Sequence, residues 1–90
     1  MRITAELSLY PLKDGYVADI RDFIVELRRH PGIDVLTNQM STQLRGELAD
    51  VMAAVGGALE FTAVRAGGAS VLVTKFVTAD LPIATVPRIA

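Results

Sequence analysis

The N-terminal segment alternates between apolar and polar side chains. The apolar ones occupy every second position: Ile3, Ala5, Leu7 and Leu9. The more polar ones fall between them: Thr4, Glu6, Ser8 and Tyr10. A period of two residues is typical of a strand with one buried face. We therefore expect a strand over residues 3–10, ended by Pro11.

Residues 16–30 follow the period of a helix instead. Their apolar side chains are three or four residues apart: Val17, Ile20, Ile24 and Leu27. This spacing forms one apolar stripe along an amphipathic helix. Asp14 is placed to cap the helix N-terminus. Pro31 stops the helix, because proline disfavours helical geometry in the residue before it.

Residues 47–64 return to helical spacing and contain Gly56 and Gly57. Each glycine costs about 1 kcal/mol relative to alanine in a helix interior. The apolar period nevertheless continues past the pair. We therefore expect the helix to continue as well, with a strand backbone packed closely against these two glycines.

Two further segments predict strands. Residues 33–46 hold two short extended pieces on either side of residues 38–41, which indicates a hairpin. Gly67 and Gly68 form the next turn, and residues 69–78 form the last strand. Both faces of this strand are partly apolar, and we place Phe76 on its outer face.

The order of these elements, β-α-β-β-α-β, predicts a ferredoxin-like α+β fold. We expect a four-stranded antiparallel sheet with two helices on one face. Residues 1–80 would form this single domain, and residues 81–90 an extended tail. The other sheet face has no cover within the chain. Because its side chains on the first strand are too polar for a second core, we expect a ligand wall or a dimer interface there.

Composition narrows the class of protein. The chain has 90 residues, and 51% of them are hydrophobic, which is more than one small core needs. A sheet face that associates with a second copy of the chain would bury the apolar surface left over. The net charge of −1, without a basic stripe, argues against nucleic acid as a partner. The absence of cysteine fits the cytoplasm, and no apolar stretch is long enough for insertion into a membrane.

Two segments carry a resemblance to a known family. Residues 5–12, Ala-Glu-Leu-Ser-Leu-Tyr-Pro-Leu, are similar to the first strand of YkoF-like proteins, and residues 37–47 to the family's middle hairpin with its Met-Ser-Thr core. The resemblance covers about residues 3–78. It implies a ferredoxin-like domain that binds thiamine or its hydroxymethylpyrimidine moiety, in the uptake or handling of thiamine precursors. The founding type has two repeats in one chain, so here a homodimer or a dimer of dimers would supply the second half.

The residues expected to hold such a ligand lie in three places. One face of the first strand carries a carboxylate and two hydroxyls, from Glu6, Ser8 and Tyr10. Neighbouring residues on this face are about 7 Å apart along the strand. The hairpin adds Asn38, Met40, Ser41, Thr42 and Gln43, and the last strand adds Phe76. A flat aminopyrimidine needs hydrogen-bonding groups of this kind beside an apolar platform.

Simpler explanations exist for each of these residues. The strand face could be an ordinary solvated surface or a dimer contact. Asn38 and Ser41 favour turns for backbone reasons alone. Met40 could fill the core, and Phe76 could be a dimer contact.

No catalytic constellation is visible in the sequence. His30 is the single histidine and stands at a helix end without a partner nucleophile. The Pro-Leu-Lys-Asp-Gly stretch at residues 11–15 lacks the arginine of an acylphosphatase anion loop. We therefore expect a ligand-binding protein rather than an enzyme, without cofactor or metal. The alternative is an ACT-like regulatory or oligomerisation module, which shares the fold.

Overall fold

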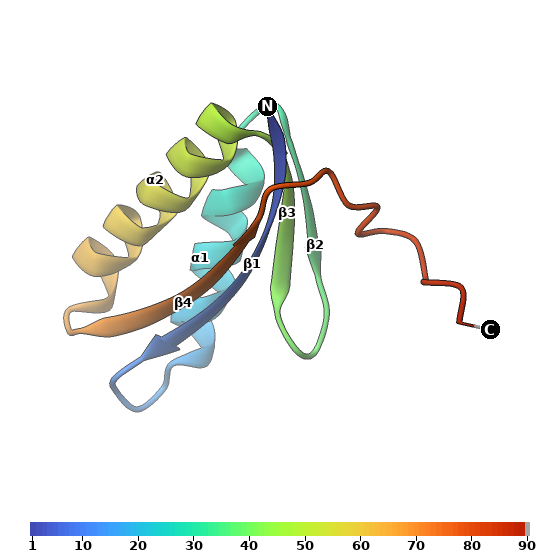
Figure 1. The fold of residues 1–90 in the computed structure, drawn as a ribbon. Helices are drawn as coiled ribbons and strands as arrows, with labels where there is room; N and C mark the ends of the chain where they lie inside the picture. Colours follow the sequence, from blue (N-terminus) through green and yellow to red (C-terminus); the bar gives the residue numbers. More distant parts are fainter. Residues whose placement is uncertain (90) are drawn as a thin grey trace.

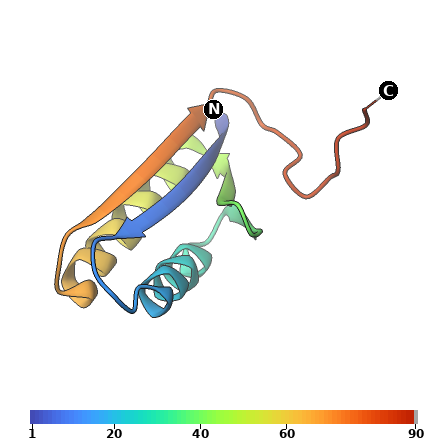
Figure 2. The same ribbon diagram turned by 90° about the horizontal axis from the view of Figure 1, so that it is seen from below.

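Residues 1–89 are described by the computed structural model and form one sheet layered against two helices. The elements are β1 (Arg2–Pro11), α1 (Val17–Arg29), β2 (Ile33–Thr37), β3 (Thr42–Glu47), α2 (Leu48–Ala66) and β4 (Ser70–Val77). The sheet is antiparallel, with strand order β2-β3-β1-β4, and both helices cover the same face (Figures 1 and 2). The predicted ferredoxin-like α+β fold is confirmed.

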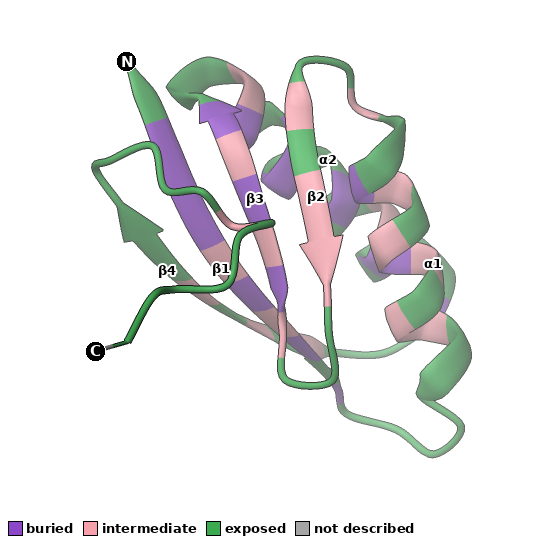
Figure 3. Cartoon of the chain, turned by 90° about the vertical axis from the view of Figure 1, so that its right-hand side faces the viewer, coloured by how far each residue is buried: buried purple, intermediate pink, exposed green. Residues whose placement is uncertain are grey.

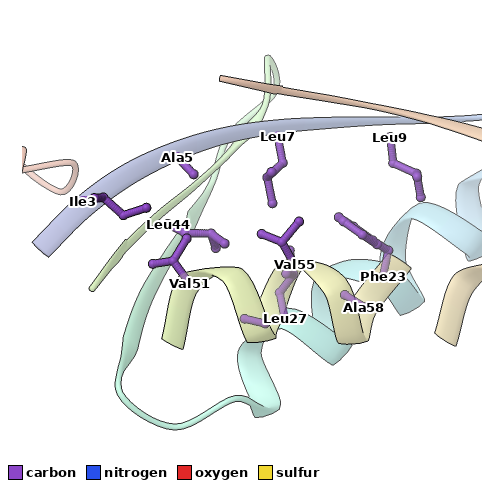
Figure 4. Packing of buried hydrophobic residues seen from close by; sticks show 11 residues of the cluster. Ile3, Ala5, Leu7, Leu9, Phe23, Leu27, Leu44, Val51, Val55 and Ala58 are labelled. Carbon is purple, nitrogen blue, oxygen red and sulfur yellow. The ribbon is translucent and has the colours of Figure 1, made fainter. Parts of the chain in front are cut away.

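The core lies between the sheet and the two helices. The odd-numbered side chains of β1 point into it, and each is at most 7% exposed: Ile3, Ala5, Leu7 and Leu9. Phe23 and Leu27 from α1 and Val51 from α2 close the core from the other side (Figure 4). The period-two pattern therefore assigned the two faces of this strand correctly.

The strand register corrects the expected position of Phe76. Phe76 stands opposite Ala5 in the β1–β4 pair, and Ala5 is fully buried beneath the helices. Directly paired residues project to the same side of a sheet, so Phe76 lies on the helix-covered face and not on the outer one. Lys75, opposite Glu6, is on the outer face instead. The sequence alone could not assign the two faces of β4, because the side chains on both faces are partly apolar.

Two expectations about the surroundings of the helices were wrong: the cap of α1 and the packing beside the glycines of α2. Asp14 does not cap α1: the N-cap position is Tyr16, and no side chain caps it. In α2, the helix does continue through Gly56 and Gly57, but no atom lies within 4 Å of where a Cβ on either would stand. These glycines are exposed, and no strand packs against them.

The glycine that does permit a close approach is Gly46 in β3. A Cβ there would lie 2.9 Å from the Gly32 carbonyl oxygen and 3.1 Å from Ile33 Cγ2. Contacts under 3.0 Å to backbone atoms require the chain to move, so only glycine fits. This contact joins the start of β2 to the end of β3.

Residues 78–89 contain neither helix nor strand, and their first part is fixed to the sheet. Thr4 Oγ1 donates to the Ala79 carbonyl at 2.8 Å and accepts from the Leu81 amide at 2.9 Å. Asp80 lies between the guanidinium groups of Arg2 and Arg45, 2.9 Å from Nε of each. The chain then leaves on the side away from the helices (Figures 1 and 2). The predicted tail covered residues 81–90, and residue 90 lies outside the described residues.

Candidate ligand-binding site

The second half of β1 has a strand neighbour on one side only. Its pairing with β3 stops at Leu7, which stands opposite Thr42, while its pairing with β4 continues to Pro11. The β2–β3 hairpin diverges from β1 toward its tip (Figure 1). Residues 8–11 therefore present an unpaired backbone edge toward the hairpin.

A pocket of about 210 Å³ lies between this edge, the hairpin tip and α1. Its apolar part comes from the core side of β1 and from α1, with Ile20, Phe23 and Ile24. The hairpin residues 37–42 form the opposite wall. Figure 3 shows the hairpin tip beside the end of β1, with α1 behind them. The pocket thus combines an apolar base with a rim of hydroxyl and amide groups.

Six of the nine residues predicted from the sequence line this pocket: Ser8, Tyr10, Asn38, Met40, Ser41 and Thr42. Glu6 and Gln43 stand opposite each other on the open sheet face. Both side chains are joined to Ser41, which lines the pocket, so they lie beside it. Ser41 Oγ donates to Glu6 Oε2 at 3.0 Å, and Gln43 Nε2 donates to Ser41 Oγ at 2.7 Å. Two segments 35 residues apart in the chain are therefore connected by one hydrogen-bonded group at the pocket rim.

Glu6 keeps part of its carboxylate accessible. Its side chain is 45% exposed, and Lys75 Nζ lies 3.7 Å from Oε1 across the β1–β4 pair. The lysine is itself 76% exposed, so this ion pair is weak and can rearrange. Glu6 can therefore accept a further hydrogen bond from a ligand without losing the one from Ser41.

Three hairpin residues play different parts. The Asn38 side-chain oxygen accepts hydrogen bonds from the backbone amides of Met40 and Ser41. Asn38 therefore stabilises the turn, as its residue type suggested. Met40 is 86% exposed at the tip and does not fill the core. Thr42 is buried on the helix-facing side, where its hydroxyl lies 3.0 Å from that of Thr37.

Other parts of the site were not found from the sequence. Ile20 and Ile24 were assigned to the apolar stripe of a helix, and their spacing could not show that the diverging hairpin leaves them, with Phe23, beside a pocket. Lys75 was missed because the β4 register was not known. Phe76, which was expected at the site, does not line the pocket.

A second polar cluster occupies the N-terminal end of the same sheet face. The hydrogen bond from Arg2, together with the nearby Arg45, lowers the pKa of Asp80 below its ordinary value of 3.8. The same hydrogen bond raises the pKa of Arg2. This cluster holds the start of the tail over Thr4, which is why Thr4 is buried on an otherwise open face.

Two further observations concern the described residues as a whole. Within residues 1–89, no group of three or more histidine, cysteine, aspartate or glutamate side chains is arranged to hold a metal ion. Neither of the described helices is both long and apolar enough to cross a membrane.

Comparison with known proteins finds similarity to solved structures. No family model matches it, and no curated protein sequence does. A hypothetical protein from Methanocaldococcus jannascii is 25% identical, with a TM-score of 0.75 over 88% of this chain and 81% of the other. A domain of unknown function from Bacillus cereus is also 25% identical, with a TM-score of 0.67 over 89% and 78%.

One structural neighbour has a functional description. It is a Thermotoga maritima protein provisionally assigned to thiamine biosynthesis or salvage. It is 18% identical, with a TM-score of 0.69 over 97% of this chain and 90% of that one. At this identity the likeness establishes a shared fold alone.

Proposed function

We propose that the protein binds thiamine or its hydroxymethylpyrimidine moiety in the pocket between the β1 edge, the hairpin tip and α1. The observation that carries the proposal is the position of Glu6, hydrogen-bonded through Ser41 at the rim of a pocket with an apolar base. A carboxylate beside an apolar slot suits a flat ring that bears an amino group.

The chemistry of an aminopyrimidine matches these groups. Its exocyclic amine is a donor and its ring nitrogens are acceptors. The unpaired edge of residues 8–11 offers backbone groups of both kinds, and Ser8 adds a hydroxyl. The ring faces would pack against Phe23 and its aliphatic neighbours on α1.

The size of the pocket favours one ring over two. At about 210 Å³ it is below the roughly 300–1,000 Å³ of sites for drug-sized ligands. The pyrimidine would therefore occupy the pocket, while the thiazolium of intact thiamine would project outward. Tyr10, which is 55% exposed at the rim, could face that cation.

The resemblance of residues 5–12 and 37–47 to YkoF-like proteins agrees with this function, and these segments contribute most of the pocket lining. The Thermotoga neighbour provisionally assigned to thiamine biosynthesis or salvage is consistent with it. We propose a carrier or sensor of thiamine precursors in the cytoplasm, without catalytic activity of its own.

Titration calorimetry tests the proposal directly. The ligands are thiamine, hydroxymethylpyrimidine and their phosphates. Glu6→Gln keeps the side-chain shape but removes the charge-assisted acceptor, so we expect affinity to fall roughly tenfold or more, about 1.4 kcal/mol. Glu60→Gln, an exposed acid on α2, is the matched control and should bind like the parent protein.

Two outcomes would contradict the proposal. One is that none of these compounds binds more tightly than millimolar. The other is that Glu6→Gln and Glu60→Gln bind equally well. A chain that binds no ligand but still self-associates would favour the ACT-like oligomerisation module instead.

A further inference from the structure

Two arginines on the open sheet face converge on one carboxylate. Arg2 lies at the start of β1, and Arg45 lies on β3 opposite Thr4. The tail crosses β1 here, and Asp80 reaches both arginines (Figure 3). Arg2 Nε is 2.9 Å from Asp80 Oδ2, and Arg45 Nε is 2.9 Å from Oδ1. The two guanidinium groups therefore form a site for an anion, which the protein's own tail occupies.

The fit of Asp80 to this site is incomplete. Arg2 Nε donates a hydrogen bond to Asp80, whereas Arg45 Nε is close to the carboxylate but not aligned for one. This Nε–H of Arg45 is shielded from water and has no hydrogen-bond partner within residues 1–89. Because buried donors in native proteins are nearly always paired, an unpaired one calls for an acceptor that the chain itself does not supply.

The other acidic side chains nearby do not fill the site. Asp34 Oδ2 lies 3.8 Å from Arg45 Nε, but the Asp34 side chain is 72% exposed, so this ion pair is weak. Glu47 is held by the amino group of Met1 at 2.9 Å. Once Asp80 leaves, the two arginines face Asp34 as their close counter-ion, and the site carries a net positive charge.

The contacts that hold the tail over the site are ones that a free anion can replace. Both ion pairs of Asp80 are partly exposed and therefore screened by water. Thr4 Oγ1 adds hydrogen bonds with the backbone of Ala79 and Leu81. From there to residue 89, the hydrogen bonds of the tail are made within the tail itself. A group on a short flexible tether competes like a ligand at a millimolar concentration, so a free anion at that concentration can displace it.

We propose that Arg2 and Arg45 bind a phosphate-type dianion in place of Asp80, and that this binding releases the tail from the sheet. Phosphate carries about two negative charges near neutral pH, and it offers more acceptor oxygens than a carboxylate. Its tetrahedral oxygens can align with both Nε donors at once. Charge-assisted hydrogen bonds to phosphate are contacts for which arginine is especially suited. The site is distinct from the pocket and does not depend on the proposed function.

Release of the tail would also change the surface next to the pocket rim. Thr4 is buried beneath the tail. Glu6 is the next residue on the same face of β1, about 7 Å further along the strand. Departure of the tail therefore uncovers the Thr4 hydroxyl beside Glu6. The phosphate can be free, or it can be part of a larger ligand that also contacts Glu6.

A phosphate titration followed by NMR tests the site. Sodium phosphate replaces sodium chloride at constant ionic strength, and two signals are followed, the Nε–H of Arg45 and the backbone amide of Leu81. We expect both signals to move saturably with a single dissociation constant in the millimolar range. Diphosphate should bind more tightly, and an increase in sodium chloride alone should give no saturable change.

Three variants separate the parts of the site. Asp80→Asn keeps the side-chain shape but removes the competing charge, so phosphate should bind severalfold more tightly. In this variant the Leu81 amide should already be near its phosphate-bound position. Arg45→Gln, followed through the Nε–H of Arg2, should weaken phosphate binding by about tenfold or more. Arg28→Gln removes an exposed arginine on α1 and is the matched control, which should bind phosphate like the parent protein.

Three outcomes would overturn the proposal. The first is that phosphate moves neither signal of the parent protein. The second is that Asp80→Asn binds phosphate no more tightly than the parent. The third is that Arg28→Gln weakens binding as much as Arg45→Gln does.

Thiamine diphosphate identifies the source of the phosphate. If Glu6→Gln weakens the binding of thiamine diphosphate but not of diphosphate, the site takes the phosphate of a ligand that also contacts Glu6. If Glu6→Gln weakens neither, the site takes free phosphate. Phosphate binding without any binding of thiamine would support this site and contradict the proposed function alone.

Discussion

The substitution Gly56→Ala tests whether α2 is open to solvent at this glycine, with no other segment packed against it. Gly56 lies in the interior of α2, is exposed, and has no atom within 4 Å of where a Cβ would stand. The added methyl group would therefore meet no steric obstacle. In an exposed helix interior, alanine is favoured over glycine by roughly 0.5–1 kcal/mol, chiefly because glycine loses more backbone entropy on folding.

The expected size follows from that difference. For a domain of this length, 1 kcal/mol shifts the melting temperature by roughly 4–8 °C, so Gly56→Ala should raise it by roughly 2–8 °C. Thermal unfolding followed by circular dichroism gives the shift, and urea unfolding gives the free energy. Gly57→Ala, which also meets open space, should behave in the same direction.

Gly46→Ala is the matched control, because it makes the same chemical change where there is no room. Its methyl group would lie 2.9 Å from the Gly32 carbonyl oxygen, so we expect a lower melting temperature. If Gly56→Ala destabilised the protein while secondary structure was retained, the open space would be filled in solution, and the reasoning would be refuted.

Three further predictions concern the core, the tail and the site. Leu27→Ala, at a fully buried position, should lower the free energy of unfolding by about 2–5 kcal/mol in urea titrations; a loss below 1 kcal/mol would contradict the packing. Because the pKa of Asp80 is lowered, its anchoring of the tail is fully present above pH 3.8 and is lost as the pH falls through the still lower folded-state value. The Leu81 amide resonance should report this release in NMR spectra, and in Asp80→Asn the acid-dependent change should be absent. Ser41→Ala removes the hydroxyl that joins Glu6 to Gln43, so ligand affinity should fall severalfold with unchanged melting; equal affinity would remove the bridge from the site.

The pocket exists because β3 stops pairing with β1 at Leu7, whereas β1 continues to pair with β4 as far as Pro11.

The sequence by itself determined the element order and the two faces of β1. Period two in residues 3–10 and period 3.6 in the helices reflect which side chains must leave water, and that requirement is local enough to read along the chain. Six of the nine expected site residues also lie together at one pocket, because they belong to two short segments that a ferredoxin-like topology brings side by side.

Only the tertiary structure decided the rest. Phe76 was assigned to the wrong face because β4 is apolar on both sides, and its face is fixed by pairing with Ala5, 71 positions earlier. The space around Gly56 and the contact at Gly46 depend on which backbone comes near them, and glycine looks the same in both settings. The pocket itself arises where a hairpin diverges from its neighbour. Such features depend on distances between segments far apart in the chain, and local side-chain preferences do not encode those distances.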